Sequence, residues 1–203
     1  MDKPNCKKVV MKNKFSLNVL HIECENNSCN ERDLTIFFIH GSMGSLTQYN
    51  DLIAFYKGRA NVVAYDTMGC GDSEKPLSNG EYSTKSLTAN SIEIFEKYAT
   101  AQNILVGHSY GTAQVARLCS HFREQNVDNP AVKVKKDISG VVLLGTVDFL
   151  PKGGSPVFNI FSLPLCFLSP MQGWMSKSYI SMAFSSNSNP VLKERALLCA
   201  GKR

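Results

Sequence analysis

The chain has 203 residues, of which 43% are hydrophobic and 19% are charged, a globular balance that excludes global disorder. This length suffices for one domain with a sizeable core but is short for two. The net charge of +5 is mild, and its two loose lysine clusters lack interleaved aromatic residues, so we expect no nucleic-acid partner.

The N-terminus, "MDKPNCKKVV", lacks the apolar core of a signal peptide, and no apolar run is long enough for a membrane span. We therefore expect an intracellular protein, in the cytoplasm or peripheral to membranes. The seven cysteines are scattered and odd in number, which favours free thiols in a reducing compartment. Cys24 and Cys29 have no second pair at zinc-finger spacing, so we expect no metal.

The first elements in chain order are two strands within residues 9–23, expected as an antiparallel edge pair. Four buried strands follow, because each run is short, β-branched or aromatic, and apolar at consecutive positions. They are "LTIFFI" (34–39), "NVVAYD" (61–66), "NILVG" (103–107) and "ISGVVLLG" (138–145). This pattern predicts a parallel sheet that is covered on both faces.

Helical patterns separate these strands at residues 46–57, 85–98 and 110–125. We expect Ser45 to cap the first helix and Ser83 or Thr84 to cap the second. Strands alternating with helices indicate an α/β fold with a doubly wound, mostly parallel sheet.

The sequence style changes after residue 150, where prolines and serines interrupt apolar residues such as those of "VFNIFSLPLCFL" (157–168). Helical pieces near 172–184 and 190–200 fit the pattern, and no further strand does. The segment is either a lid over an apolar cleft or a surface excursion packed on the core, and the residues do not decide between them.

A serine lies between two glycines in Gly107-His108-Ser109-Tyr110-Gly111, directly after a predicted strand and before a predicted helix. This is the G-x-S-x-G pattern in its required context, where a strained turn holds up the serine hydroxyl as a nucleophile. The glycines are needed because a Cβ at either position would collide with the neighbouring strand or helix. The helix N-terminus beneath Ser109 favours developing negative charge.

A second glycine-rich loop, His40-Gly41-Ser42-Met43-Gly44, follows strand 34–39. Acyl transfer passes through an oxyanion that two fixed N–H donors stabilise. We expect the backbone amides of Ser42 and Tyr110 to be these donors, with Gly41 and Gly44 allowing the close approach. His40 and His108 are interpreted as support for the loop and the turn rather than as general bases.

A third loop, "DTMGCGDSEKP" (66–76), has the pattern D-x-x-G-x-G-x-S. Taken alone it is an ordinary glycine-rich turn. A dinucleotide site would need G-x-G-x-x-G, and position 74 is Glu, so we expect no cofactor.

With these motifs in this order, the chain resembles the α/β-hydrolase superfamily, in its abhydrolase-domain-containing branch and closest to subgroup eight. The motifs are "FFIHGSMGSL", "NVVAYDTMGCGDSEKP", "NILVGHSYG" and "FNIFSLPLCFLSP". The resemblance implies edge strands in 1–29, an α/β-hydrolase core in 30–150 and a lid-like segment in 151–203. It also implies two further strand–helix units, so we expect an incomplete sheet, truncated at the C-terminus, with a bare apolar edge strand open to pairing.

The resemblance implies a triad in the order Ser, acid, His, with the histidine as base. Only His121 follows Ser109, and twelve helical residues separate them by about 18 Å. No catalytic histidine is therefore expected in this chain. Asp148, just after strand 138–145, is the candidate acid, because some hydrolases of this fold place it there; otherwise it is a loop or capping aspartate.

Two hypotheses follow for function. The first is a lipase-like serine esterase that cleaves carboxylic esters of lipids, with peripheral membrane or lipid-droplet contact. The second is a catalytically inactive hydrolase fragment that serves as a lipid- or protein-binding module. A lysophospholipid acyltransferase-like relative is a further alternative, although no acceptor pocket is identified. The sequence sets no oligomeric state.

Overall fold

The computed structural model describes residues 5–24, 34–128 and 136–146, together with 174, 177–178, 190–191 and 194. The chain divides into two compact units, Met1–Val147 and Asp148–Arg203. The first unit carries the elements below, and the described positions of the second are helical. Asp148, and nearly all of the predicted lid-like segment 151–203, lie outside the described residues.

The first unit is built on a mixed six-stranded sheet with the strand order β1-β2-β4-β3-β5-β6. Strands β4, β3, β5 and β6 run parallel to one another. At one edge β1 and β2 form an antiparallel pair, and β2 also pairs antiparallel with β4. The predicted strands are confirmed, with bounds of Lys7–Val10, Ser16–Ile22, Leu34–Ile39, Asn61–Tyr65, Gln102–His108 and Asp137–Leu144 for β1 to β6.

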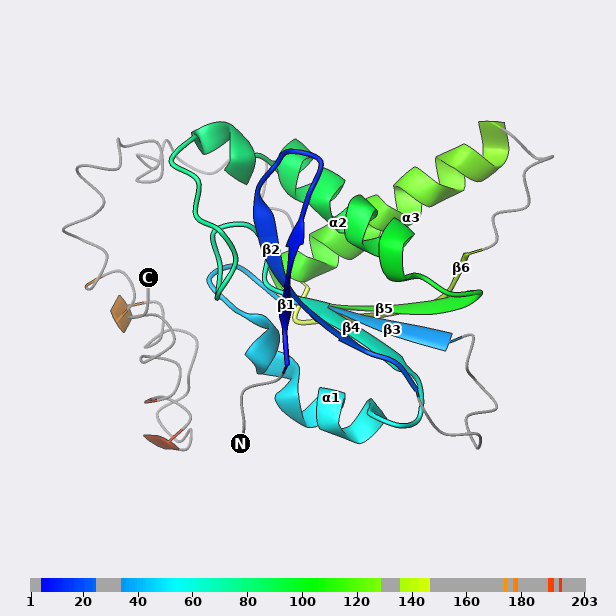
Figure 1. Ribbon diagram of the computed structural model, residues 1–203, viewed down its shortest axis with the longest axis horizontal. Helices are drawn as coiled ribbons and strands as arrows, with labels where there is room; N and C mark the ends of the chain where they lie inside the picture. Colours follow the sequence, from blue (N-terminus) through cyan, green and yellow to red (C-terminus); the bar gives the residue numbers. More distant parts are fainter. Residues whose placement is uncertain are drawn as a thin grey trace. The chain divides into compact units, whose positions relative to one another are not determined.

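Helices cover both faces of this sheet, with α1 on one side and α2 and α3 on the other (Figure 1). The three helices span Asn50–Tyr56, Thr84–Tyr98 and Tyr110–Asp128, and short 3-10 helices η1 and η2 span Leu46–Tyr49 and Asn79–Tyr82. None of the described helices combines the length and the apolar character needed to cross a bilayer. The doubly wound arrangement predicted from the sequence is confirmed.

Successive residues of the central strands face opposite sides of the sheet and enter two separate cores. On β3, Phe37 and Ile39 pack with the α2 and α3 side, whereas Ile36 and Phe38 pack with the α1 side. Because both faces are covered, a buried parallel strand needs apolar residues at consecutive positions rather than alternate ones. This requirement explains the sequence pattern of β3, β4 and β5.

The first helical segment begins differently from the prediction. Residues 46–49 form a 3-10 turn before α1, and Ser45, although extended, makes no side-chain capping bond. Its hydroxyl instead lies 2.6 Å from the Thr47 hydroxyl. Ser45 therefore occupies the predicted N-cap position, but its side chain makes no capping bond, because a neighbouring hydroxyl competes for it.

The strand β6 forms one edge of the sheet that the described residues build. Its last four side chains, Val141 to Leu144, are 38% to 46% exposed, whereas Val62 to Ala64 in the sheet interior are fully buried. The predicted apolar edge strand is thus observed in the described part of the chain.

The cysteines differ in state. Cys6, Cys70 and Cys119 are free thiols, but Cys24 is disulfide-bonded. The expectation that all cysteines are free is therefore wrong at Cys24. Composition alone could not reveal this bond, because pairing depends on which chain segments meet.

The start of α2 provides a test of local stability. The Ser83 hydroxyl accepts a hydrogen bond from the Ser86 N–H at 3.2 Å, which satisfies one free donor of the first turn. We expect Ser83→Ala to lower the free energy of unfolding by about 1 kcal/mol. Ser78 precedes η2 without a side-chain capping bond, so Ser78→Ala is the matched control. Urea unfolding measures both, and an equal loss in the two variants would contradict the capping role.

Candidate active site

Ser109 occupies a sharp turn between β5 and α3 with a φ of 51°, in the left-handed region. Such a conformation costs a non-glycine residue about 1–3 kcal/mol unless its surroundings impose it. Two neighbours do so: the Ser109 N–H donates to the Leu144 carbonyl at 2.9 Å, and the Thr112 N–H donates to the Ser109 carbonyl at 2.9 Å. Ser109 is only half-buried, so it is not enclosed by packed side chains.

The two glycines that flank Ser109 lie at backbone contacts. A Cβ on Gly111 would lie 2.1 Å from the Ile39 carbonyl oxygen, and one on Gly107 would lie 2.7 Å from the Gly111 carbonyl oxygen. Both distances are far inside van der Waals contact, and backbone atoms cannot rotate away as a side chain can. The ends of β3 and β5 and the start of α3 therefore meet only because these positions lack side chains.

The loop 40–44 lies directly against the turn at Ser109. A Cβ on Gly41 would be 2.8 Å from the Cβ of Ser109. The Gly44 N–H donates to the Gly41 carbonyl at 3.1 Å, which closes the loop, and Met43 takes a left-handed φ of 58°. The loop thus brings its backbone close to the Ser109 side chain.

The backbone amides of Ser42 and Tyr110 are the predicted oxyanion donors. Ser42 lies in the loop 40–44, and Tyr110 is the first residue of α3. Within the described ranges, neither N–H has a recorded hydrogen-bond partner. Free N–H donors of this kind, at a helix N-terminus and in a tight loop, attract negative charge.

His40 is buried and holds two loops together. Its Nε2 accepts a hydrogen bond from the Thr67 N–H at 3.0 Å, and its Nδ1 lies 2.7 Å from the Gly41 carbonyl. Because Nε2 accepts from a backbone amide, the proton must sit on Nδ1, which then donates to Gly41. The lone pair of the ring is therefore occupied, and His40 cannot take a proton from Ser109 in this arrangement.

His108 lies between the loop 40–44 and the end of β6. A Cβ built on Gly41 would lie 3.1 Å from the His108 Nδ1, and a Cβ built on Gly145 would lie 3.8 Å from its Nε2. The Nδ1 atom is buried and has no hydrogen-bond partner among the described residues. The ring therefore supports the turn by packing.

No histidine of the described residues is hydrogen-bonded to the Ser109 hydroxyl. His21 pairs with Glu23 at 3.9 Å on β2, and His121 lies twelve residues along α3 from Ser109, about 18 Å away along the axis. The described part of the chain thus brings together a candidate nucleophile and candidate donors, but no base. No group of three or more His, Cys, Asp or Glu side chains in that part could hold a metal ion.

Asp66 organises the third loop in a way that the sequence pattern did not reveal. Its buried carboxylate accepts hydrogen bonds from the Leu46 N–H at 2.7 Å and from the Asn18 amide and the Asp72 N–H at 2.9 Å each. A Cβ on Gly71 would lie 2.2 Å from this carboxylate. The sequence signal that could have predicted this network is an aspartate at the end of a buried strand, followed by glycines three and five residues later.

Tyr49 fixes the end of β3 from the α1 side, and it too was missed as a site residue. Its hydroxyl donates to the Ile39 carbonyl at 2.9 Å, the same oxygen that Gly111 approaches. Burial raises the pKa of Tyr49 above its ordinary value, so the phenol keeps its proton and its donor role even in alkaline solution.

Comparison with known families agrees with this geometry. Residues 35–164 match the model of the alpha/beta hydrolase fold family. The chain is similar to the human protein ABHD8, with 30% identity over 192 residues that cover 90% of this chain and 39% of that protein. The chain therefore spans about two fifths of the length of this relative.

Solved structures share the fold. An esterase from Exiguobacterium antarcticum matches with a TM-score of 0.73 at 12% identity, covering 96% of this chain and 67% of that one. The epoxide hydrolase VrEH1 from Vigna radiata matches with a TM-score of 0.64 at 19% identity, covering 98% and 67%. At these identities the likeness concerns the fold, which hosts different reactions.

The backbone contact at Gly111 gives a test of the turn. We expect Gly111→Ala to destabilise the fold by about 3 kcal/mol or more, because its Cβ would overlap the Ile39 carbonyl oxygen. Gly80 is exposed, and a Cβ there would meet only the Ser78 hydroxyl, at 3.6 Å, so Gly80→Ala is the control. Thermal unfolding compares the two, and a Gly111→Ala melting temperature equal to that of Gly80→Ala would contradict the contact.

Proposed function

This chain belongs to the α/β-hydrolase family, and from that premise we propose that it is a serine hydrolase that cleaves carboxylic esters, with Ser109 as the nucleophile. One observation carries the proposal. The half-buried Ser109 is held at a left-handed φ of 51°, beside two backbone N–H groups, of Ser42 and Tyr110, that have no recorded partner in the described ranges.

The chemistry follows from this arrangement. The Ser109 oxygen attacks the ester carbonyl carbon, and the carbonyl oxygen becomes an oxyanion that the Ser42 and Tyr110 amides stabilise. The carbon–oxygen bond to the alcohol then breaks, and the proton lost by Ser109 passes through a base to the leaving alcohol. Water attacks the acyl-serine in the second half, which releases the carboxylic acid and restores the hydroxyl.

The proposed substrate class is a lipid acyl ester. Its support is the sequence "VFNIFSLPLCFL" (157–168), an apolar segment that would accommodate an acyl chain as a lid. In the same proposal, Asp148 is the acid that would orient the base, although both features lie outside the described residues.

The proposal requires a general base that accepts the proton of the Ser109 hydroxyl. The mechanism needs an imidazole at Ser109, and the four histidines of the sequence are His21, His40, His108 and His121. In the described structure, His40 is engaged with Thr67 and Gly41, and none of the four bonds to Ser109. Without the base, oxyanion stabilisation and substrate binding supply the remaining rate, typically about 10³–10⁴ over water.

A second candidate function is a binding module that has kept the hydrolase fold, and it fits the described residues, in which no histidine bonds to Ser109. In such a protein, the site would hold an ester or acyl group without cleaving it. The two candidates differ in whether Ser109 reacts faster than an ordinary serine.

A fluorophosphonate probe tests the reactivity of Ser109. We expect the probe to label Ser109 of the 203-residue chain slowly, and added imidazole to accelerate labelling by about 10² because it supplies the absent base. Intact-mass and peptide mass spectrometry give the rate and the position. Ser109→Ala is the control for labelling at other serines. Labelling at the rate of Ser109→Ala, with and without imidazole, would support the binding module instead.

The oxyanion donor at position 42 has its own test. Ser42→Pro removes the backbone N–H, whereas Ser42→Ala keeps it and removes only the hydroxyl. We expect Ser42→Pro to slow labelling of Ser109 by about 10²–10³ and Ser42→Ala to leave it within about twofold. Circular dichroism confirms that both variants fold, and equal rates in the two variants would exclude this amide as a donor.

A further inference from the structure

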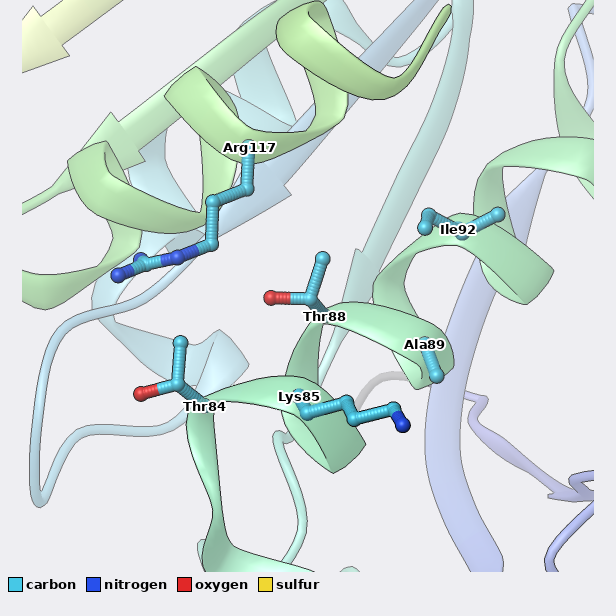
Figure 2. A pocket seen from close by; sticks show the side chains of 6 residues that line it. All are labelled: Thr84, Lys85, Thr88, Ala89, Ile92 and Arg117. Carbon is cyan, nitrogen blue, oxygen red and sulfur yellow. The ribbon is translucent and has the colours of Figure 1, made fainter.

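An open depression of about 520 Å³ lies between α2 and α3, apart from the candidate active site. We call it the α2–α3 depression; its lining residues are Thr84, Lys85, Thr88, Ala89, Ile92 and Arg117 (Figure 2). Arg117 is eight residues beyond Ser109 on α3, so about 12 Å of helix separates them. The volume falls within the range of about 300–1,000 Å³ that small-ligand sites occupy.

Arg117 is the most informative residue of the α2–α3 depression. Its Nη1 atom is buried and has no hydrogen-bond partner among the residues that the structure describes. A guanidinium stays charged at any physiological pH and has only donors, so a buried N–H without an acceptor is costly. In the described part of the chain, the recorded ion pairs join Lys12 with Glu96 and His21 with Glu23, and neither involves Arg117. This nitrogen therefore lacks an anionic acceptor.

A second unpaired donor lies next to the α2–α3 depression. The Thr88 hydroxyl donates to the side-chain oxygen of Gln114 at 3.2 Å. Gln114 is almost fully buried at 1% exposure, and its Nε2 has no hydrogen-bond partner within the described part of the chain. Arg117 and Gln114, on successive turns of α3, thus both present unused N–H groups.

The α2–α3 depression has a polar and an apolar part. Figure 2 shows the hydroxyls of Thr84 and Thr88 directed to the side on which the Arg117 guanidinium lies, whereas Ala89 and Ile92 lie on the other side. Lys85 is exposed, and Figure 2 shows its side chain directed toward the side of Ala89, away from the Arg117 guanidinium. The Arg117 charge with two hydroxyls at one end, and the aliphatic carbons of Ala89 and Ile92 at the other, suit a ligand with an anionic head and a hydrocarbon chain.

We propose that the α2–α3 depression binds an amphiphilic anion, with a phosphate monoester or carboxylate head at Arg117 and its alkyl chain against Ala89 and Ile92. The head accepts hydrogen bonds from the guanidinium and the Thr84 hydroxyl, and Lys85 adds only a longer-range positive charge from the other side. This site does not require Ser109 to be reactive, so it stands or falls separately from ester hydrolysis.

Titration calorimetry of the 203-residue chain with octyl phosphate and with octanoate tests the site. We expect saturable binding of at least one of them with a Kd of about 1 mM or tighter, the affinity reached by ligands of this size. Inorganic phosphate should bind several-fold more weakly, because it lacks the chain, and the stronger of the two amphiphiles identifies the head. Octyl glucoside, a neutral amphiphile, should not bind, and its binding as tightly as the anions would overturn the proposal.

Substitutions locate the binding. We expect Arg117→Gln to weaken binding about tenfold, since it removes a charge-assisted hydrogen bond, and Arg117→Lys to retain part of the affinity. Lys85→Gln should weaken it about twofold, as expected for an exposed charge. Arg123→Gln on α3 and Lys97→Gln on α2 remove exposed charges from the same helices and serve as matched controls.

Ala89→Trp provides a test that leaves the buried Arg117 intact. Ala89 is exposed, so the larger side chain fills the α2–α3 depression without entering the core, and we expect it to abolish binding. Equal affinities for Arg117→Gln and Arg123→Gln, or unchanged binding by Ala89→Trp, would show that the anion binds elsewhere and would overturn the proposal. If Arg117→Gln does not fold, as judged by circular dichroism, the Ala89→Trp result decides.

Discussion

The candidate site depends on a close approach of backbone to backbone. The ends of β3 and β5 and the start of α3 meet with no side chain between them, because Gly107 and Gly111 lack a Cβ. The same closeness holds Ser109 in a left-handed conformation that an isolated chain would leave. Strain at one residue is thereby maintained by contacts made at its neighbours.

The parallel strand arrangement decides which loops reach this point. β3, β4 and β5 are adjacent and parallel, so the loops that follow them leave the same edge of the sheet. His40 ties the loop after β3 to Thr67 after β4, and Asp66 ties the start of η1 to β2 and to its own loop. These buried polar groups fix loops that apolar packing alone would leave adjustable.

The geometry of the site indicates where a reaction would occur, but it does not by itself identify the reaction. A strained serine beside unpaired amides suits acyl transfer, yet fold likeness includes both an esterase and an epoxide hydrolase, so fold does not choose the reaction. The choice depends on a base at Ser109, which the described residues do not supply. The proposed anion site in the α2–α3 depression depends on other atoms, chiefly the Arg117 Nη1, which has no partner among the described residues. It concerns binding rather than bond cleavage.

The sequence alone determined the strand and helix order, the turn at Ser109 and the family, because apolar runs and glycine spacing are local signals. It missed the Asp66 network, the Tyr49 contact with Ile39 and the bonded state of Cys24. The Asp66 carboxylate reaches Leu46 and Asn18, which are 20 and 48 residues away along the chain, and Tyr49 reaches Ile39 across 10 residues. Only the tertiary structure decides such pairings, because a residue's partners depend on the order of the strands in space. The spacing of residues along one segment does not encode that order.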